Sequence, residues 1–244
     1  MSEEEKEMTI WDHLGELRNR LFIALISLVV TTLLSFIFAD RFVQLLTIPI
    51  GGLQNLIAIE VTENISVFMK VSLLSGFILA LPFILYELLA FVMPGLTDSE
   101  RKWVIIAIPL ASVFFLVGVA FCYFIMLPAA IPFLVSFLGV KTTPRLSNYI
   151  GFVTNMMFWI GISFELPLLV FVLAKLKLVT AKQLGKQWRL AVVIIAVVAA
   201  VVTPTPDPVN MSLLMAPLFV LYLLSIFFAF LARRGEKSDE VIKK

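Results

Sequence analysis

Long apolar runs, separated by short polar segments, occupy most of the 244-residue chain. Runs of about 18 or more apolar residues are too long for an ordinary core helix and predict membrane-spanning helices. The runs predict spans at about residues 21–38, 67–92, 103–127, 149–174, 189–202 and 211–232. We therefore expect a single integral membrane domain over residues 1–244, all-α with six transmembrane helices.

The segment before the first span, residues 9–20, has an amphipathic helical pattern. Ile10, Leu14 and Leu17 recur at helical spacing on one face, and the opposite face is polar. A helix of this kind typically lies at the membrane surface with its apolar face toward the lipid. We expect residues 9–20 to form such a surface helix ahead of the first span.

The fifth span is unusually short. Its charge-free run, residues 190–202, has 13 residues and would reach only about 20 Å, against about 30 Å of hydrocarbon. The following sequence TPTPDPVN at 203–210 is too rich in proline to be helical, and Pro217 interrupts the sixth span. We expect short fifth and sixth helices, joined by a turn at 203–207 that lies below the membrane surface.

Composition and charge agree with this arrangement. Hydrophobic residues make up 61% of the chain and charged residues 15%, against about 45–50% and 25% in soluble proteins. Basic residues accumulate on the cytoplasmic side of membrane proteins. With the N-terminus inside, 15 of the 19 Lys and Arg residues fall on inner segments, and the outer ones hold only Arg41, Lys70, Lys141 and Arg145. Both termini, including the tail 233–244, are therefore predicted to be cytoplasmic.

Histidine and cysteine, which most zinc sites and all disulfides require, are scarce in this chain. The chain has one histidine, His13, and one cysteine, Cys122, too few for the usual His/Cys zinc site or for an intrachain disulfide. It also lacks the GxxxxGK[ST] loop that binds nucleotide phosphates. We expect neither an enzyme nor a metal ion, a cofactor or a nucleic-acid partner.

Two acidic residues fall within predicted spans, where charges are costly and often functional. Glu165 lies centrally in the fourth span, in GISFELPLL, with no basic residue near it in the sequence. The alternative to a functional role is a structural one, in which Glu165 forms a hydrogen bond with a neighbouring helix or with carbonyl groups freed by Pro167. Glu87 lies closer to the cytoplasmic end of the second span, where its side chain can reach the interface. Glu165 is therefore the stronger candidate.

Two further acids are predicted at the inner surface. Glu16 lies in the amphipathic segment, and its alternative role is an i,i+4 ion pair with Arg20. Glu100 ends the sequence TDSE at 97–100, where it fits a capping box at the start of the third span. Spacing alone favours these local roles over a binding role.

Four motifs together resemble the TatC family, the membrane receptor of the twin-arginine protein translocase. The motifs are HLGELRNRL at 13–21, LPFILYELLAFVMPGLTDSERK at 81–102, GISFELP at 161–167 and TPTPD at 203–207. They occur in the family's order over about residues 9–232, together with the expected six spans. The resemblance implies a multi-pass protein of a prokaryotic inner membrane with the concave shape of TatC.

The resemblance also implies a function. It implies that the protein binds the Arg-Arg signal peptides of folded cargo proteins. It also implies that the protein works with single-span TatA and TatB partners, that it self-associates in the translocase, and that the proton-motive force drives export. The residues that match the family's functional positions include the signal-peptide candidates Glu16, Glu100, Arg18, Phe91 and Pro94, the intramembrane Glu165, the loop residue Pro49 and, as a further candidate, Asp207. The resemblance does not extend to Glu87, because some family members have an uncharged residue there.

A proton-coupled transporter of small molecules is the rival prediction. Proline-interrupted helices and the acidic residue Glu165 near the middle of a span are also typical of that class. The chain lacks a detectable inverted repeat, however, and places Glu16 and Glu100 at the inner surface. A purely structural membrane scaffold would leave Glu165 unexplained. These observations favour the receptor.

Overall fold

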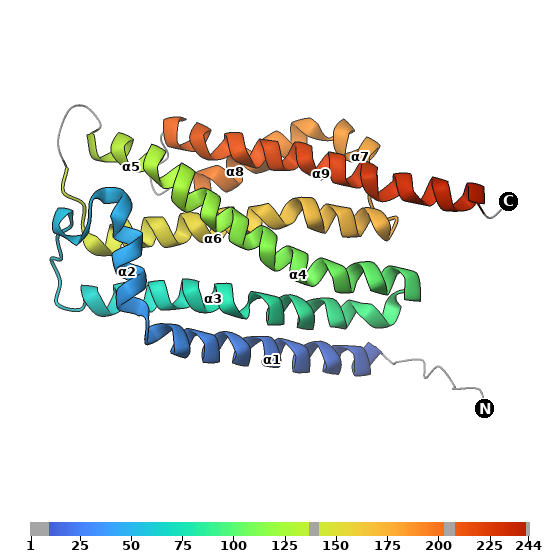
Figure 1. Cartoon of the computed structure of the whole chain (residues 1–244), viewed down its shortest axis with the longest axis horizontal. Helices are drawn as coiled ribbons and strands as arrows, with labels where there is room; N and C mark the ends of the chain where they lie inside the picture. The colour runs from blue at the N-terminus through green and yellow to red at the C-terminus, as the bar shows by residue number, and fades with distance from the viewer. Residues whose placement is uncertain (1–9, 137–141, 203–207, 243–244) are drawn as a thin grey trace.

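The computed structural model of the protein describes residues 10–136, 142–202 and 208–242. Within these ranges the chain is almost entirely helical, and its β structure is limited to one isolated bridge between Ile57 and Arg145 (Figure 1). The predicted all-α fold class is confirmed.

The helices run roughly along one axis and meet at two ends. The long helices are α1 (Ile10–Phe36), α3 (Glu63–Val92), α4 (Asp98–Phe121), α6 (Leu146–Lys175) and α9 (Pro208–Ile242). The shorter elements are α2 (Ala39–Thr47), η1 (Ile48–Ile50), η2 (Leu53–Asn55), η3 (Met93–Gly95), the π-helical η4 (Cys122–Met126), α5 (Leu127–Ser136), α7 (Ala181–Lys186) and α8 (Trp188–Val202). We call the end at which α1 begins and α9 ends the terminal end, and the end that carries α2 the loop end (Figure 1).

In the described part of the chain, five helical segments are long and apolar enough to cross a membrane. They are His13–Phe36, Glu63–Gly95, Arg101–Ser136, Leu146–Lys175 and Leu214–Ala232. The remaining apolar helix, α8, has 15 residues and rises only about 22 Å. This helix is the short fifth span that the sequence predicted.

Three boundaries differ from the predicted ones. Residues 10–20 are continuous with the first span, because α1 runs without a break from Ile10 to Phe36. The third helical run continues past Pro128 to Ser136 through the π-helical segment η4, where the wider turn precedes a residue that lacks an amide N–H. The last helix extends beyond its apolar run, because the Arg, Lys and Glu residues that follow are good helix formers.

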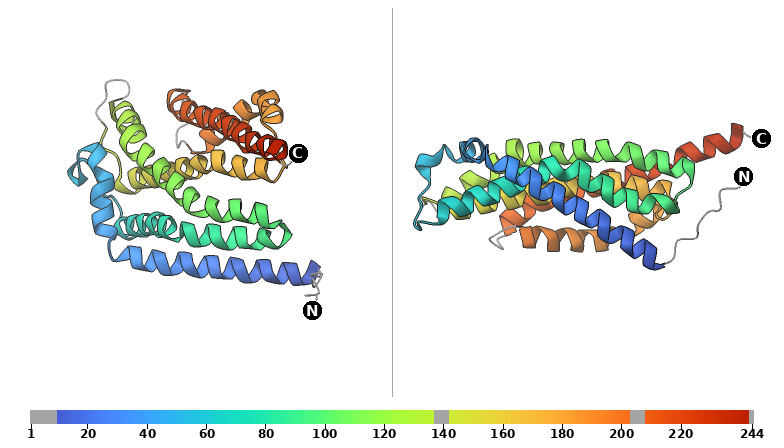
Figure 2. Two further views of the ribbon diagram at one scale, coloured as in Figure 1. Left: turned by 45° about the vertical axis from the view of Figure 1, so that its right-hand side comes forward. Right: turned by 90° about the horizontal axis from the view of Figure 1, so that it is seen from below.

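Across the bundle, α1 forms one edge, and α9 with α7 and α8 forms the opposite edge (Figures 1 and 2). The largest apolar core brings α3, α6, α8 and α9 together. Close approach of α1 to α3 depends on Gly76, where a Cβ atom would lie 2.5 Å from the Thr32 Cα. The hydroxyl of Thr31 donates a hydrogen bond to the Gly76 carbonyl at 2.8 Å. This packing brings polar groups of α1 and α3 together at the terminal end.

Candidate functional site

Two carboxylates at the terminal end hold one arginine between them. Arg20 on α1 donates from Nη2 to Oε1 of Glu16 at 2.6 Å and from Nε to the same oxygen at 2.8 Å. Its Nη1 donates to Oε2 of Glu87 on α3 at 3.2 Å. The predicted ion pair between Glu16 and Arg20 therefore exists, and it extends to Glu87. We call these three residues the arginine site.

The arginine site carries more acid than base. Two carboxylates face one guanidinium, and the side chains of Glu16, Glu87 and Arg20 are 21%, 13% and 27% exposed. The second oxygen of Glu16, Oε2, is buried and has no hydrogen-bond partner among the described residues. Nδ1 of His13 lies 4.0 Å from this oxygen. The oxygen is closed to a ligand in this conformation, so a ligand would have to displace a neighbouring side chain to reach it.

An aromatic pair borders the arginine site. The rings of His13 on α1 and Phe91 on α3 stack with 4.2 Å between centroids and 18° between planes. Phe91 is half-buried, and Pro94 is exposed in the short helix η3 that follows. Arg18 is exposed and lines a separate shallow apolar groove on α1. The structure thus brings Phe91 next to Glu16, but it does not bring Arg18 there.

Two predicted site residues lie outside the described side chains. The backbone of Glu100 is in the first turn of α4, where the Arg101 amide donates to the Thr97 carbonyl at 2.9 Å. The Glu100 side chain lies outside the described residues, and so does all of Asp207. A shared site for Glu16 and Glu100 stays a prediction.

Glu165 lies in the middle of α6 and is half-buried. Its Oε1 atom is buried without a hydrogen-bond partner among the described residues. The carboxylate is nevertheless within hydrogen-bond reach of the Phe115 backbone amide on α4, so a structural role of Glu165 through a neighbouring helix remains an alternative. At the loop end, the predicted residue Pro49 is half-buried in η1.

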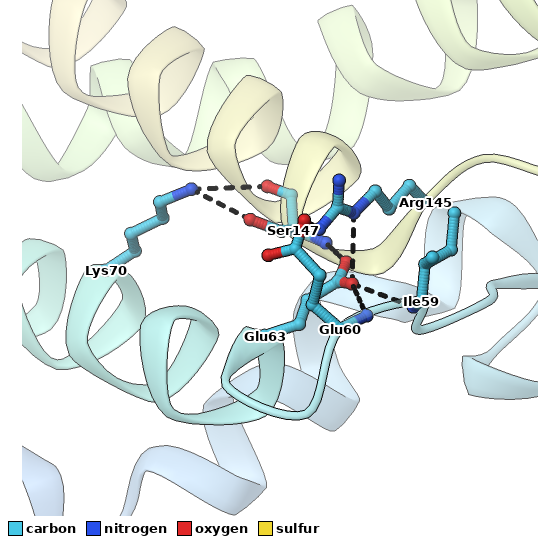
Figure 3. A network of polar contacts seen from close by, with 6 residues as sticks. All are labelled: Ile59, Glu60, Glu63, Lys70, Arg145 and Ser147. Carbon is cyan, nitrogen blue, oxygen red and sulfur yellow. Dashed lines mark hydrogen bonds and ion pairs between the residues drawn. The ribbon is translucent and has the colours of Figure 1, made fainter.

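A second polar cluster, which no local sequence pattern predicts, lies at the loop end (Figure 3). Glu63, at the start of α3, is 2% exposed. Its Oε1 accepts from the Ser147 amide at 2.6 Å, and its Oε2 accepts from the Ile59 amide and Arg145 Nε, both at 3.0 Å. Arg145 also pairs with Glu60 at 2.7 Å. The carboxylates of Glu60 and Glu63 raise the pKa of Arg145, so the guanidinium stays charged and joins α3 to the start of α6.

The described residues hold no group of three His, Cys, Asp or Glu side chains that could bind a metal ion. What the fold and the arginine site define is a multi-pass helical membrane protein in which two carboxylates hold one arginine at one end. A family model described as Sec-independent protein translocase protein (TatC) matches residues 12–217. The chain belongs to the TatC family.

Related proteins match almost the whole chain in sequence, and solved structures match almost the whole chain in fold. The TatC protein of Carboxydothermus hydrogenoformans is 35% identical over 97% of this chain and 99% of that protein. The TatC protein of Deinococcus radiodurans is 36% identical over 89% of this chain and 84% of that protein. A crystal structure of the twin arginine translocase receptor TatC superposes with a TM-score of 0.79, at 35% identity, over 90% of this chain and 99% of that one. With its apolar helices, this chain is a multi-pass inner membrane protein.

Proposed function

We propose that this chain is the signal-peptide receptor of a twin-arginine translocase, and that it binds two consecutive arginines at the terminal end. The observation that carries the proposal is the arginine site, in which Glu16 and Glu87 already coordinate the guanidinium of Arg20. Carboxylates placed to bind one guanidinium are suited to bind another.

The chemistry of this site favours arginine over lysine. A guanidinium is planar and always charged, and its fork of donors matches a carboxylate with two parallel hydrogen bonds. Each charge-assisted hydrogen bond contributes about 1.5–3 kcal/mol net. A lysine ammonium cannot make the planar fork, so a pair of fixed carboxylates discriminates between the two residues.

Arg20 occupies the position that a cargo arginine would take. Glu16 Oε2 is buried and has no hydrogen-bond partner among the described residues, so a first arginine would bind Glu16 by displacing Arg20 from Oε1. A second arginine either displaces Arg20 from Glu87 or binds Glu100, which the family motif places at the start of α4. The stacked rings of His13 and Phe91 offer a flat surface beside the incoming guanidinium.

The proposed topology places the terminal end in the cytoplasm, where signal peptides are presented. It rests on the basic residues, 15 of 19 of which fall on the segments assigned to that side. The apolar part of a signal peptide would then lie against the spans. The short helix α8 and the mid-span Glu165 belong to the later transport step.

We assign to Glu165 a role in assembly or transport rather than in capture. Its Oε1 atom, about two thirds of the way along α6, has no partner among the described residues and could accept a hydrogen bond from a polar side chain of a single-span partner of the TatA or TatB type. Driven by the proton-motive force, this assembly would move folded cargo. Self-association of the chain in the translocase is part of the same proposal.

A cross-linking experiment tests the proposed receptor directly. A photoreactive residue in place of Phe91 should capture a twin-arginine signal peptide, and the adduct should be lost when the peptide carries Lys-Lys. The same substitution at Ile59, exposed at the loop end, is the matched control and should give no adduct. Equal capture at both positions, or equal capture of both peptides, would reject the assignment of the site.

A further inference from the structure

A second pocket opens near the loop end, on the side of the bundle formed by α1, α3, α6 and the end of α8. Its volume is about 970 Å³. One end is polar, with Lys70, Ser147 and Asn148, and the walls are apolar, with Leu73, Phe77 and Phe158. None of these residues belongs to the arginine site.

The pocket adjoins the end of α8, where Val201 and Val202 line it. The Asn155 side chain donates a hydrogen bond to the carbonyl of Val202, the last residue of α8, at 3.2 Å. Asn155 lies nine residues beyond the start of α6 at Leu146, a rise of about 13 Å. The described part of α8 therefore ends beside Asn155 rather than beside the start of α6, and the recess extends along α6 from Ser147 to Phe158.

Lys70 is the cation at the polar end of this recess. It is half-buried, and its Nζ donates to the Ser147 carbonyl at 3.4 Å and to the Ser147 hydroxyl at 3.2 Å (Figure 3). It forms no ion pair with a carboxylate of the described residues. The nearby acid Glu63 is already neutralised by Arg145. A lysine on a membrane-facing helix with no acidic partner is costly unless an external anion accompanies it.

We propose that this recess binds an anionic phospholipid from the leaflet at the loop end. Its phosphate would lie on Lys70, Ser147 and Asn148, and one acyl chain would descend along Leu73, Phe77 and Phe158. The polar-to-apolar order of the pocket matches that of a lipid entering from the membrane surface, and the positive charge of Lys70 matches its phosphate. The bound lipid would lie beside the end of α8.

Gly151 controls the space at the polar end. A Cβ atom at Gly151 would lie 3.4 Å from the Lys70 Nζ. A large side chain there would occupy the phosphate position without removing the lysine. Gly151→Leu therefore separates loss of space from loss of charge.

Native mass spectrometry of the purified full chain with added phosphatidylglycerol or phosphatidylcholine tests the proposal. The wild type should bind phosphatidylglycerol about fivefold more strongly, the factor expected for one basic residue. Lys70→Gln and Gly151→Leu should lose this preference, whereas Lys70→Arg should keep it. Lys102→Gln, which removes an exposed charge at the terminal end, should also keep it. A preference unchanged in both Lys70→Gln and Gly151→Leu would overturn the proposal.

Two further measurements distinguish other occupants. Inorganic phosphate should not displace the lipid, because the acyl chain provides part of the binding. Displacement by phosphate at equal concentration would instead identify a free-anion site. In membranes, a photoreactive residue in place of Phe152, which lines the pocket, should form adducts with lipid. Adducts with a protein chain would show that the recess is a protein interface and would exclude the lipid assignment.

Discussion

Arg20 links α1 and α3 at the terminal end through its contacts with Glu16 and Glu87. If it occupies the position of a cargo arginine, its removal should free both carboxylates. We predict that Arg20→Gln raises the affinity for an Arg-Arg signal peptide at least about tenfold, the lower end of the range for loss of one competing charge-assisted bond of about 1.5–3 kcal/mol. Isothermal titration of the purified protein measures this, and Lys182→Gln, at an exposed lysine on α7, is the control. A lower affinity would mean that Arg20 maintains the shape of the site.

Glu165 is the second residue whose role can be tested by single substitutions. Its buried Oε1 atom has no partner among the described residues, so we expect its main contribution when the translocase is assembled. We predict that Glu165→Ala abolishes export of a folded reporter, and that Glu165→Gln, which can still hydrogen-bond, impairs export less. Signal-peptide binding should stay normal in both variants. Normal export rates in both variants would show that Glu165 has only a structural role.

At the scale of elements, the close packing of α1 on α3 determines whether Glu16 and Glu87 reach the same arginine. A Cβ atom at Gly76 would lie 2.5 Å from the Thr32 backbone, so Gly76→Ala should separate the two helices. We predict a loss of about 1–3 kcal/mol of stability, typical of overpacking, and weaker peptide binding. Thermal unfolding in detergent measures the first. Gly185→Ala is the control, because this helical glycine has open space around it, and it should not destabilise the protein. Equal stability of the two variants would contradict the packing argument.

Sequence patterns predicted the elements better than the contacts between them. Apolar runs and the 13-residue charge-free segment were sufficient for the spans and for the short helix α8, because both depend on local composition. The joining of residues 9–20 to the first span was missed, since an amphipathic start and a continuous helix have the same local pattern. The pair Glu63–Arg145 was missed because 82 residues separate its members, and no local spacing relates them. Glu87 was ranked below Glu165 because its side chain can reach the interface from the cytoplasmic end of its span, and its contact with Arg20, 67 residues away, has no local sequence signal.

At the scale of the whole molecule, the positive-inside distribution predicts that the terminal end is cytoplasmic. After replacement of the buried Cys122, single cysteines at Gly51 and Lys141 should react with an impermeant thiol reagent added outside the cell. Cysteines at Ser99 and Lys182 should react only after the membrane is opened. Labelling of Ser99 from outside would reverse the topology and would place the arginine site on the wrong side for a receptor.

The central claim is that carboxylates at the terminal end recognise an arginine pair. Its most direct test is the affinity of the purified protein for a signal peptide with Arg-Arg against one with Lys-Lys, at two salt concentrations. The wild type should bind the Arg-Arg peptide more tightly than the Lys-Lys peptide, and its affinity should fall as the salt concentration rises. Glu16→Gln, Glu87→Gln and Glu100→Gln should each lose part of that preference while remaining folded, and Gln at position 100 can still complete a capping box. Unchanged discrimination in all three variants would contradict the account and would place the receptor site elsewhere in the molecule.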